Sequence, residues 1–126
     1  MALPKNLRYS EYVWVEVRGD VATLGVTDYG LKVTKDIVFI DLPKKGQKID
    51  KGKTFASLES VKWSGHLASP VSGEVIEANS PLFDAPEKLN QEPYKSWICR
   101  IKLSKPAEIQ QLMDSKKAEE WVKDNL

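Results

Sequence analysis

Short strand-like runs, separated by turns that contain glycine or proline, place the strongest constraint on the fold of this chain. In residues 12–26, three valines alternate with other side chains before the turn Arg18-Gly19-Asp20, and a second strand-like run follows. Alternation on both sides of a short turn predicts an antiparallel hairpin. The remaining runs lie at 36–42, 48–49, 54–60, 67–69, 74–78 and 97–103. So many short strands predict a mainly β fold, either a barrel or a sandwich.

Two parts of this pattern carry more specific expectations. Residues 36–42 are apolar and β-branched, and Pro43 closes them, so we expect a buried strand. Residues 70–73 are rich in proline, serine and glycine and predict a turn. In that turn, Gly73 can adopt a positive φ at little steric cost.

Helices are expected to be few and short before the last strand. Thr27 or Asp28 can cap a short helical turn that Gly30 ends. Residues 79–95 contain three prolines and many polar side chains. This segment predicts a loop with at most one helical turn, near residues 86–89.

The C-terminal part of the chain is helical in pattern. Pro106 suits the first position of a helix over 106–112, and Ser115 can cap a helix over 115–125. The second helix has an apolar stripe formed by Ala118, Trp121 and Val122. We expect this stripe to pack on the sheet.

Composition narrows the class of protein. A length of 126 residues fits one domain, 1–126, and a net charge of +1 gives no reason to expect nucleic acid or an anionic membrane as a partner. No apolar run approaches the ~20 residues of a membrane helix, and the N-terminus lacks a signal or transit pattern. The single Cys99 excludes an internal disulfide and fits a reducing compartment. We therefore expect a cytoplasmic protein in which Cys99 is a small strand residue.

Catalytic and metal-binding patterns are weak, which leaves Lys62 as the candidate residue. The single His66 has no cysteine or histidine at metal-ligand spacing, and no nucleophile elbow or phosphate-binding glycine loop is present. We therefore expect no enzyme. Lys62 lies between strand-like runs, at a predicted hairpin tip that would hold it exposed. Such a lysine suits attachment of a covalent group, although the Glu59-x-x-Lys62 spacing alone is also that of an ordinary solvated lysine.

The wider pattern around Lys62 resembles the glycine cleavage system H protein family. Residues 59–62, followed by 69–75, are similar to the lipoyl-lysine hairpin of that family. Further similarity to its first hairpin, central strand and last strand lies in residues 19–29, 36–43, Asn90, Pro93-Tyr94, Trp97 and 101–104. These motifs occur in the family's order, which makes the resemblance specific.

This resemblance implies a barrel-sandwich hybrid, the fold of lipoyl domains, with short helices and a C-terminal helix. It implies lipoic acid in amide linkage to Lys62, with Glu59 and Gly73 as the positions that lipoate-attaching enzymes sense. In the family, the arm carries an aminomethyl group between glycine decarboxylase, aminomethyltransferase and dihydrolipoyl dehydrogenase, and the carrier catalyses nothing. Because a carrier has to release each partner, we expect a monomer.

The residues after the lysine depart from the family pattern. Small side chains are usual there, whereas this chain has Trp63-Ser64-Gly65-His66. Trp63 and His66 are candidates for contacts with the arm or a partner; alternatively, Trp63 is a cross-strand aromatic that stabilises the hairpin. The departures keep open a second function, that of an H-like lipoate-binding protein carrying sulfur intermediates for a heterodisulfide-reductase-like complex. A biotin carrier is disfavoured, because Val61 and Trp63 rather than methionines flank Lys62.

Overall fold

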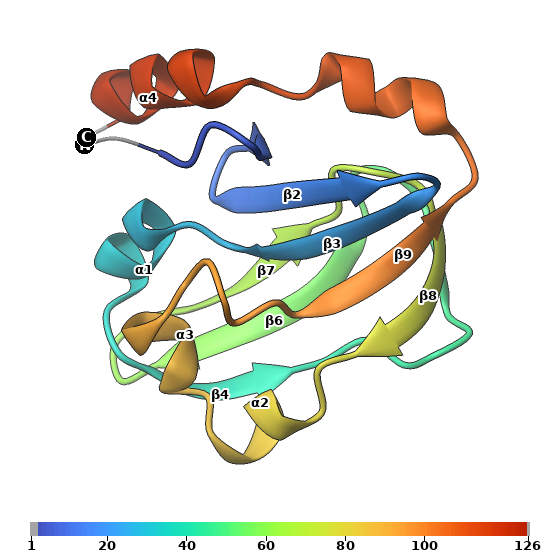
Figure 1. The fold of residues 1–126 in the computed structure, drawn as a ribbon. Helices are drawn as coiled ribbons and strands as arrows, with labels where there is room; N and C mark the ends of the chain where they lie inside the picture. The colour runs from blue at the N-terminus through green and yellow to red at the C-terminus, as the bar shows by residue number, and fades with distance from the viewer. Residues whose placement is uncertain (1–2, 126) are drawn as a thin grey trace.

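Two antiparallel sheets form the body of the molecule in the computed structural model, which describes residues 3–125 (Figure 1). The larger sheet has the order β1 (Arg8–Ser10), β2 (Val13–Arg18), β3 (Val21–Val26), β9 (Cys99–Leu103), β8 (Gly73–Ala78) and β5 (Lys48–Ile49). The smaller sheet has the order β4 (Ile37–Asp41), β6 (Thr54–Ser60) and β7 (Ser64–Ala68). The predicted mainly β, barrel-sandwich fold is confirmed.

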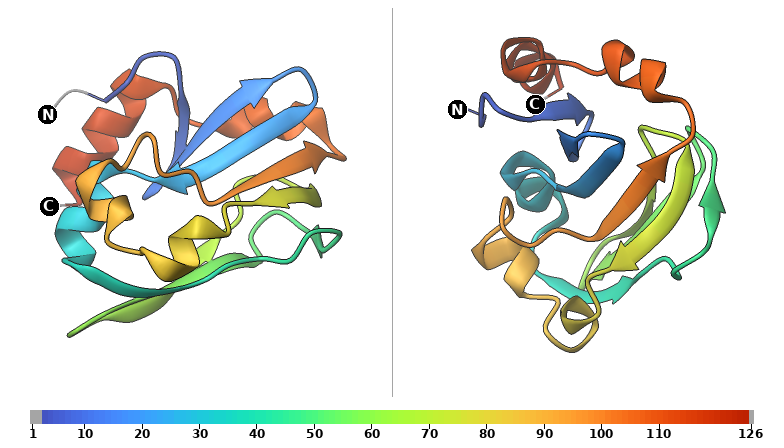
Figure 2. Two further views of the ribbon diagram at one scale, coloured as in Figure 1. Left: turned by 60° about the horizontal axis from the view of Figure 1, so that its bottom comes forward. Right: turned by 45° about the vertical axis from the view of Figure 1, so that its right-hand side comes forward.

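The helices lie at the margins of the sheets (Figures 1 and 2). They are α1 (Asp28–Thr34), α2 (Pro81–Asp84), α3 (Lys88–Gln91), a 3₁₀ helix over Pro106–Gln111, and α4 (Ser115–Asp124). Helix α4 packs on the N-terminal segment, where Ala118 joins Tyr9 and Trp14 in a small apolar cluster. None of these described helices has the length and apolar character needed to cross a membrane.

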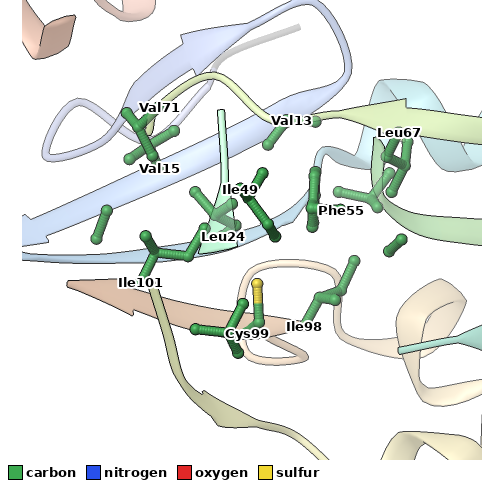
Figure 3. Packing of buried hydrophobic residues seen from close by; sticks show 14 of the residues in the cluster. Val13, Val15, Leu24, Ile49, Phe55, Leu67, Val71, Ile98, Cys99 and Ile101 are labelled. Carbon is green, nitrogen blue, oxygen red and sulfur yellow. The ribbon is translucent and has the colours of Figure 1, made fainter. Parts of the chain in front are cut away.

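The main core fills the space between the two sheets (Figure 3). Val15, Leu24 and Ile101 from the larger sheet and Leu58 from the smaller sheet are completely buried in it. Burial of each such side chain contributes about 1.5–3 kcal/mol. Cys99 belongs to this core, and burial raises the pKa of its thiol to about 12. The thiol therefore stays protonated near neutral pH, as expected for a small strand residue rather than a nucleophile.

The first hairpin forms as its alternation predicts. Val13 to Arg18 pair with Val26 to Val21, and Gly19 takes a φ of 61° in the turn.

The helix that follows this hairpin, α1, differs from expectation. Thr27 caps α1 by accepting a hydrogen bond from the Gly30 N–H at 3.1 Å, but Gly30 does not end the helix, which continues to Thr34. A Cβ at Gly30 would lie 2.9 Å from that of Tyr12, so glycine serves close packing here instead of termination.

Strand β4 is not the fully buried strand that its composition predicts. Ile37 and Ile40 are buried, whereas Val38 and Phe39 are exposed. A register shift between Ile37 and Phe39, where β4 pairs with β6, breaks the regular alternation. β4 is also an edge strand of its sheet, so an apolar run could not reveal that one face remains open to solvent.

The segment 79–95 holds two short helices, α2 and α3, where at most one helical turn was expected. The Asn90 side chain fixes α3 by accepting from the Ile37 N–H at 2.9 Å and donating to the Lys35 carbonyl at 3.0 Å. The last helix begins at Ser115 as predicted, but a different residue caps it. Asp114, not Ser115, is the N-cap, and its carboxylate accepts from the Lys117 N–H at 2.9 Å.

Candidate functional site

Lys62 occupies the tip of the hairpin formed by β6 and β7. The Ser60 N–H donates to the Trp63 carbonyl at 2.7 Å, so only Val61 and Lys62 form the loop between them. Both loop residues are exposed, with Val61 at 83%. The hairpin projects from the body in the left view of Figure 2. The predicted location of Lys62 is therefore observed, although β7 begins at Ser64 and not at Leu67 as the sequence pattern suggested.

The two strands below the tip hold Lys62 in a defined position. β6 is the central strand of its sheet, paired with β4 on one side and β7 on the other. Glu59 pairs with Ser64 directly below the turn, and the preceding residue, Leu58, is completely buried in the core. Backbone freedom at the tip is thus limited to two residues, and the long lysine side chain supplies the reach.

The hairpin has two faces with different roles. Trp63 lies on the inner face with Gly65 and Leu67, and it is half-buried against the main core. A Cβ at Gly65 would lie 2.5 Å from a carbon of the Trp63 ring, so the indole covers the glycine. The contact therefore supports a role of Trp63 in stabilising the hairpin, but the indole packs on Gly65 of the adjoining strand β7 and not on a residue of the opposite strand.

His66 points to the outer face and is exposed. Its Nδ1 lies 2.7 Å from the hydroxyl oxygen of Ser57, the residue opposite it on β6. Across residues 3–125, the structure shows no carboxylate that accepts a hydrogen bond from this imidazole, so the pair lacks the third group that orients a catalytic histidine. Trp63 and His66 thus lie on opposite faces and do not form a joint surface.

Glu59 is exposed on the same outer face as His66. Among the described residues, the structure contains no salt bridge to Glu59 or to Lys62. It also contains no cluster of three or more potential metal ligands within that range. The site therefore consists of an amine and a carboxylate, both accessible from solvent.

Gly73 lies away from this site. β7 has five residues and carries the chain about 15 Å from the turn, at ~3.3 Å per residue. The loop 69–72 then crosses to the other sheet, where Gly73 begins β8 and pairs with Ile49 and Leu103. The expectation that Gly73 adopts a positive φ is wrong, because Gly73 is not among the positive-φ residues of the described chain. Its role in recognition by an attaching enzyme stays a prediction.

The Gly73 backbone is tightly enclosed. A Cβ there would overlap the Lys102 carbonyl oxygen and would lie 2.6 Å from Cγ2 of Ile101. Close approach of β9 therefore requires glycine at this position. The sequence signal for this close approach is the position of Gly73 directly before a strand-like run, because glycine inside a strand often marks close backbone approach.

Sequence reasoning missed an exposed aromatic pair beside the hairpin. Phe39 of β4 and Phe83 of α2 are 39% and 56% exposed, and their rings meet edge to face with centroids 5.8 Å apart. Phe39 lies directly opposite Glu59 in the sheet. The sequence contained no signal for this contact, because it depends on the register shift in β4 and on the placement of α2.

Comparisons with known proteins agree with this architecture. The family model for the glycine cleavage H-protein matches residues 7–125. The glycine cleavage system H protein of Acidobacterium capsulatum is 46% identical over 125 residues, which cover 98% of this chain and 97% of that protein. The protein of the same name from Staphylococcus saprophyticus is 42% identical over 124 residues, covering 97% of this chain and 98% of its own.

A solved structure shares the fold. The crystal structure of a glycine cleavage system H protein from Mycobacterium marinum superposes with a TM-score of 0.87 at 23% sequence identity, covering 98% of this chain and 100% of that one. That likeness concerns the fold, whereas the family model and the two curated relatives concern the sequence along almost its whole length. Together with the ordered motifs around Lys62, they show that this chain belongs to the glycine cleavage H-protein family.

Proposed function

We propose that this chain is the lipoyl carrier of a glycine cleavage system, with lipoic acid in amide linkage to Lys62. The observation that carries the proposal is the exposed Lys62 on a two-residue loop braced by β6 and β7. The relatives named glycine cleavage system H protein favour this function over the sulfur-carrying alternative.

The residues at the tip fit a covalently attached group. The Lys62 amine is accessible, and no described acidic side chain pairs with it. The fixed loop presents this amine to an enzyme that supplies an activated acyl group, while the nearby Glu59 offers that enzyme a charged contact. Amide formation removes the positive charge of the lysine, so the attached arm has no electrostatic attraction to Glu59.

The carrier presents the attached group, and the partner enzymes catalyse the reactions on it. When bound, a lipoyl group supplies a dithiolane that accepts and releases an aminomethyl group. The rigid hairpin keeps the arm's attachment point outside the body, which raises the local concentration of the carried group at each partner. The partners under this proposal are a lipoate-attaching enzyme, glycine decarboxylase, aminomethyltransferase and dihydrolipoyl dehydrogenase.

Intact mass tests the attachment. Incubation with a lipoate ligase, lipoate and ATP is expected to add one lipoyl group to the wild type and none to Lys62→Ala. Lys53→Ala is the matched control, because Lys53 is another exposed lysine beside a turn, and it is expected to gain the group normally. Modification of Lys62→Ala, or an unmodified wild type, would contradict the proposal.

Exchange of bicarbonate with the glycine carboxyl group tests the pathway. The lipoylated protein is expected to support this exchange with an authentic glycine decarboxylase. Absence of exchange, together with turnover by a heterodisulfide-reductase-like complex, would favour the sulfur-carrying function instead.

The carrier is further proposed to act as a cytoplasmic monomer. Its single thiol, at Cys99, is buried and suits a reducing compartment, and a carrier must separate from each enzyme after every transfer. Light scattering during size-exclusion chromatography is expected to give the monomer mass of 14.2 kDa. A concentration-independent dimer would contradict the monomer proposal.

A further inference from the structure

The small sheet exposes an apolar surface next to the hairpin that carries Lys62. The register shift in β4 leaves two consecutive apolar side chains, Val38 and Phe39, open to solvent at 55% and 39%. Phe83 of α2 extends this surface through its edge-to-face contact with Phe39. We call Val38, Phe39 and Phe83 the aromatic patch. Bulges commonly redirect side chains toward functional surfaces, and exposed aromatic side chains are frequent anchors of protein interfaces.

The strands and the helix that carry the aromatic patch hold acidic side chains and no basic ones within their bounds. The three elements that form this surface, β4, β6 and α2, carry the carboxylates Asp41, Glu59 and Asp84 and no lysine or arginine. The chain as a whole has a net charge of +1, so this local excess of negative charge is not a property of the entire surface. A partner that covers the patch should therefore present basic residues around an apolar centre.

The aromatic patch lies within reach of any protein that contacts the hairpin tip. Phe39 is directly opposite Glu59 on the neighbouring strand, and Glu59 is three residues before Lys62. Strand spacing and rise then place Phe39 about 10 Å from the turn. An interface of standard size buries about 800 Å² on each partner, which corresponds to a disc of about 16 Å radius. An interface centred on Lys62 would include the patch.

The length of the unmodified side chain identifies which partner needs this contact. Before attachment, the only reach available is the four-carbon stem of the lysine. The attaching enzyme must therefore approach the strands on either side of the tip to bring its acyl donor to the amine. Enzymes that act after attachment can reach the end of the arm from further away.

On this basis, and resting on the proposed lipoylation of Lys62, we propose that the aromatic patch with its acidic rim is the docking surface for the lipoate-attaching enzyme. The partner's apolar surface covers Phe39 and Phe83, while its basic residues face Asp41, Glu59 and Asp84. Phe39 and Phe83 are specificity-determining residues in this arrangement. They act by binding the enzyme and have no part in formation of the amide bond.

The test compares lipoylation kinetics of the unmodified protein and its variants with a lipoate ligase, lipoate and ATP. Phe39→Ala and Phe83→Ala are expected to lower kcat/KM about tenfold through a higher KM, with kcat at saturation almost unchanged. Asp84→Lys is expected to raise KM at low salt, and that difference should shrink as added salt screens the charges. Val33→Ala is the control, because Val33 is 43% exposed on α1, outside the patch. Thermal unfolding establishes that each variant is folded at the assay temperature.

Each outcome decides the proposal. Wild-type kinetics in folded Phe83→Ala, which removes the more exposed ring, would overturn it. So would normal lipoylation accompanied by loss of exchange with glycine decarboxylase, because the patch would then serve a later partner. A wild type that gains no lipoyl group refutes the proposed function itself, whereas a modified wild type with unaffected variants refutes the docking surface alone.

Discussion

Replacement of Gly73 by alanine separates a role in folding from a role in recognition. The resemblance to the family implies that an attaching enzyme senses this position, yet Gly73 lies on a different sheet from Lys62. Its backbone is enclosed between β5 and β9. We predict that Gly73→Ala destabilises the fold and impairs lipoylation only at temperatures where the variant unfolds, because no contact with the enzyme is lost.

The size of the effect follows from the contacts that a Cβ would make. Besides its overlap with the Lys102 carbonyl oxygen, the added carbon would lie 2.9 Å from the Lys102 carbonyl carbon. These are backbone atoms of a paired strand, so they cannot move aside as a flexible side chain would. Overpacking of this kind costs about 3 kcal/mol. For a chain of this length, such a loss lowers the Tm by about 10 °C.

Thermal unfolding and lipoylation rate are measured on the same samples. Gly73→Ala is expected to unfold about 10 °C below the wild type, yet to be lipoylated at nearly the wild-type rate well below its own Tm. Gly19→Ala is the matched control, because Gly19 has a φ of 61° and open space around it. There the left-handed backbone alone should cost about 1 kcal/mol. Glu59→Gln is expected to behave oppositely, with an unchanged Tm and a reduced rate.

Two results would refute this reasoning. A Tm for Gly73→Ala within the range of Gly19→Ala would show that β8 and β9 accommodate the methyl group. A fully folded Gly73→Ala that is nevertheless a poor substrate would show that the attaching enzyme contacts this position directly.

Three further perturbations test other parts of the structure. Asn90→Ala removes the bonds to the Ile37 N–H and the Lys35 carbonyl. It should lower the free energy of unfolding in urea by about 1–3 kcal/mol, whereas Gln91→Ala, on the exposed side of α3, should change it little. The Cys99 thiol has a pKa of about 12 when folded against 9.0 as a reference, so unfolding releases a proton above pH 9 and stability falls as pH rises. The wild type should lose about 1 kcal/mol more than Cys99→Ala between pH 9 and pH 10. Trp63→Ala should lower the Tm because the indole is half-buried against the core, and a Tm equal to that of the wild type would place Trp63 outside the hairpin's packing.

The parts of the fold that the sequence predicted are those governed by local pattern. The hairpin of β2 and β3 follows from alternation around a glycine turn, and the bounds of β6 match the predicted run 54–60. The parts that differ depend on contacts between distant segments. Whether β4 is buried depends on its position at a sheet edge, and α3 is held by Asn90 across more than fifty residues. No local pattern reports such contacts.

The candidate site shows the same division. The exposure of Lys62 was predictable, because the strand-like runs 54–60 and 67–69 lie on either side of it, although the two-residue length of the turn was not. The separation of Gly73 from Lys62 was not, since proximity in sequence suggested one continuous hairpin. The chain instead leaves the smaller sheet after Ala68 and enters the larger one at Gly73. Two residues that belong to the same family motif therefore do not necessarily contact the same partner.

The two faces of the hairpin explain how this chain can change its partner-facing residues without losing the fold. On the inner face, Trp63 and Leu67 contact the core, so substitutions there act on stability. On the outer face, Glu59 and His66 are exposed and make no contact with the core, so substitutions there alter the surface that an enzyme meets. Alternation of side chains along β6 and β7 keeps these two faces apart, and Trp63 lies just before the start of β7. We therefore expect the departure at His66 to affect recognition and the departure at Trp63 to affect packing against Gly65.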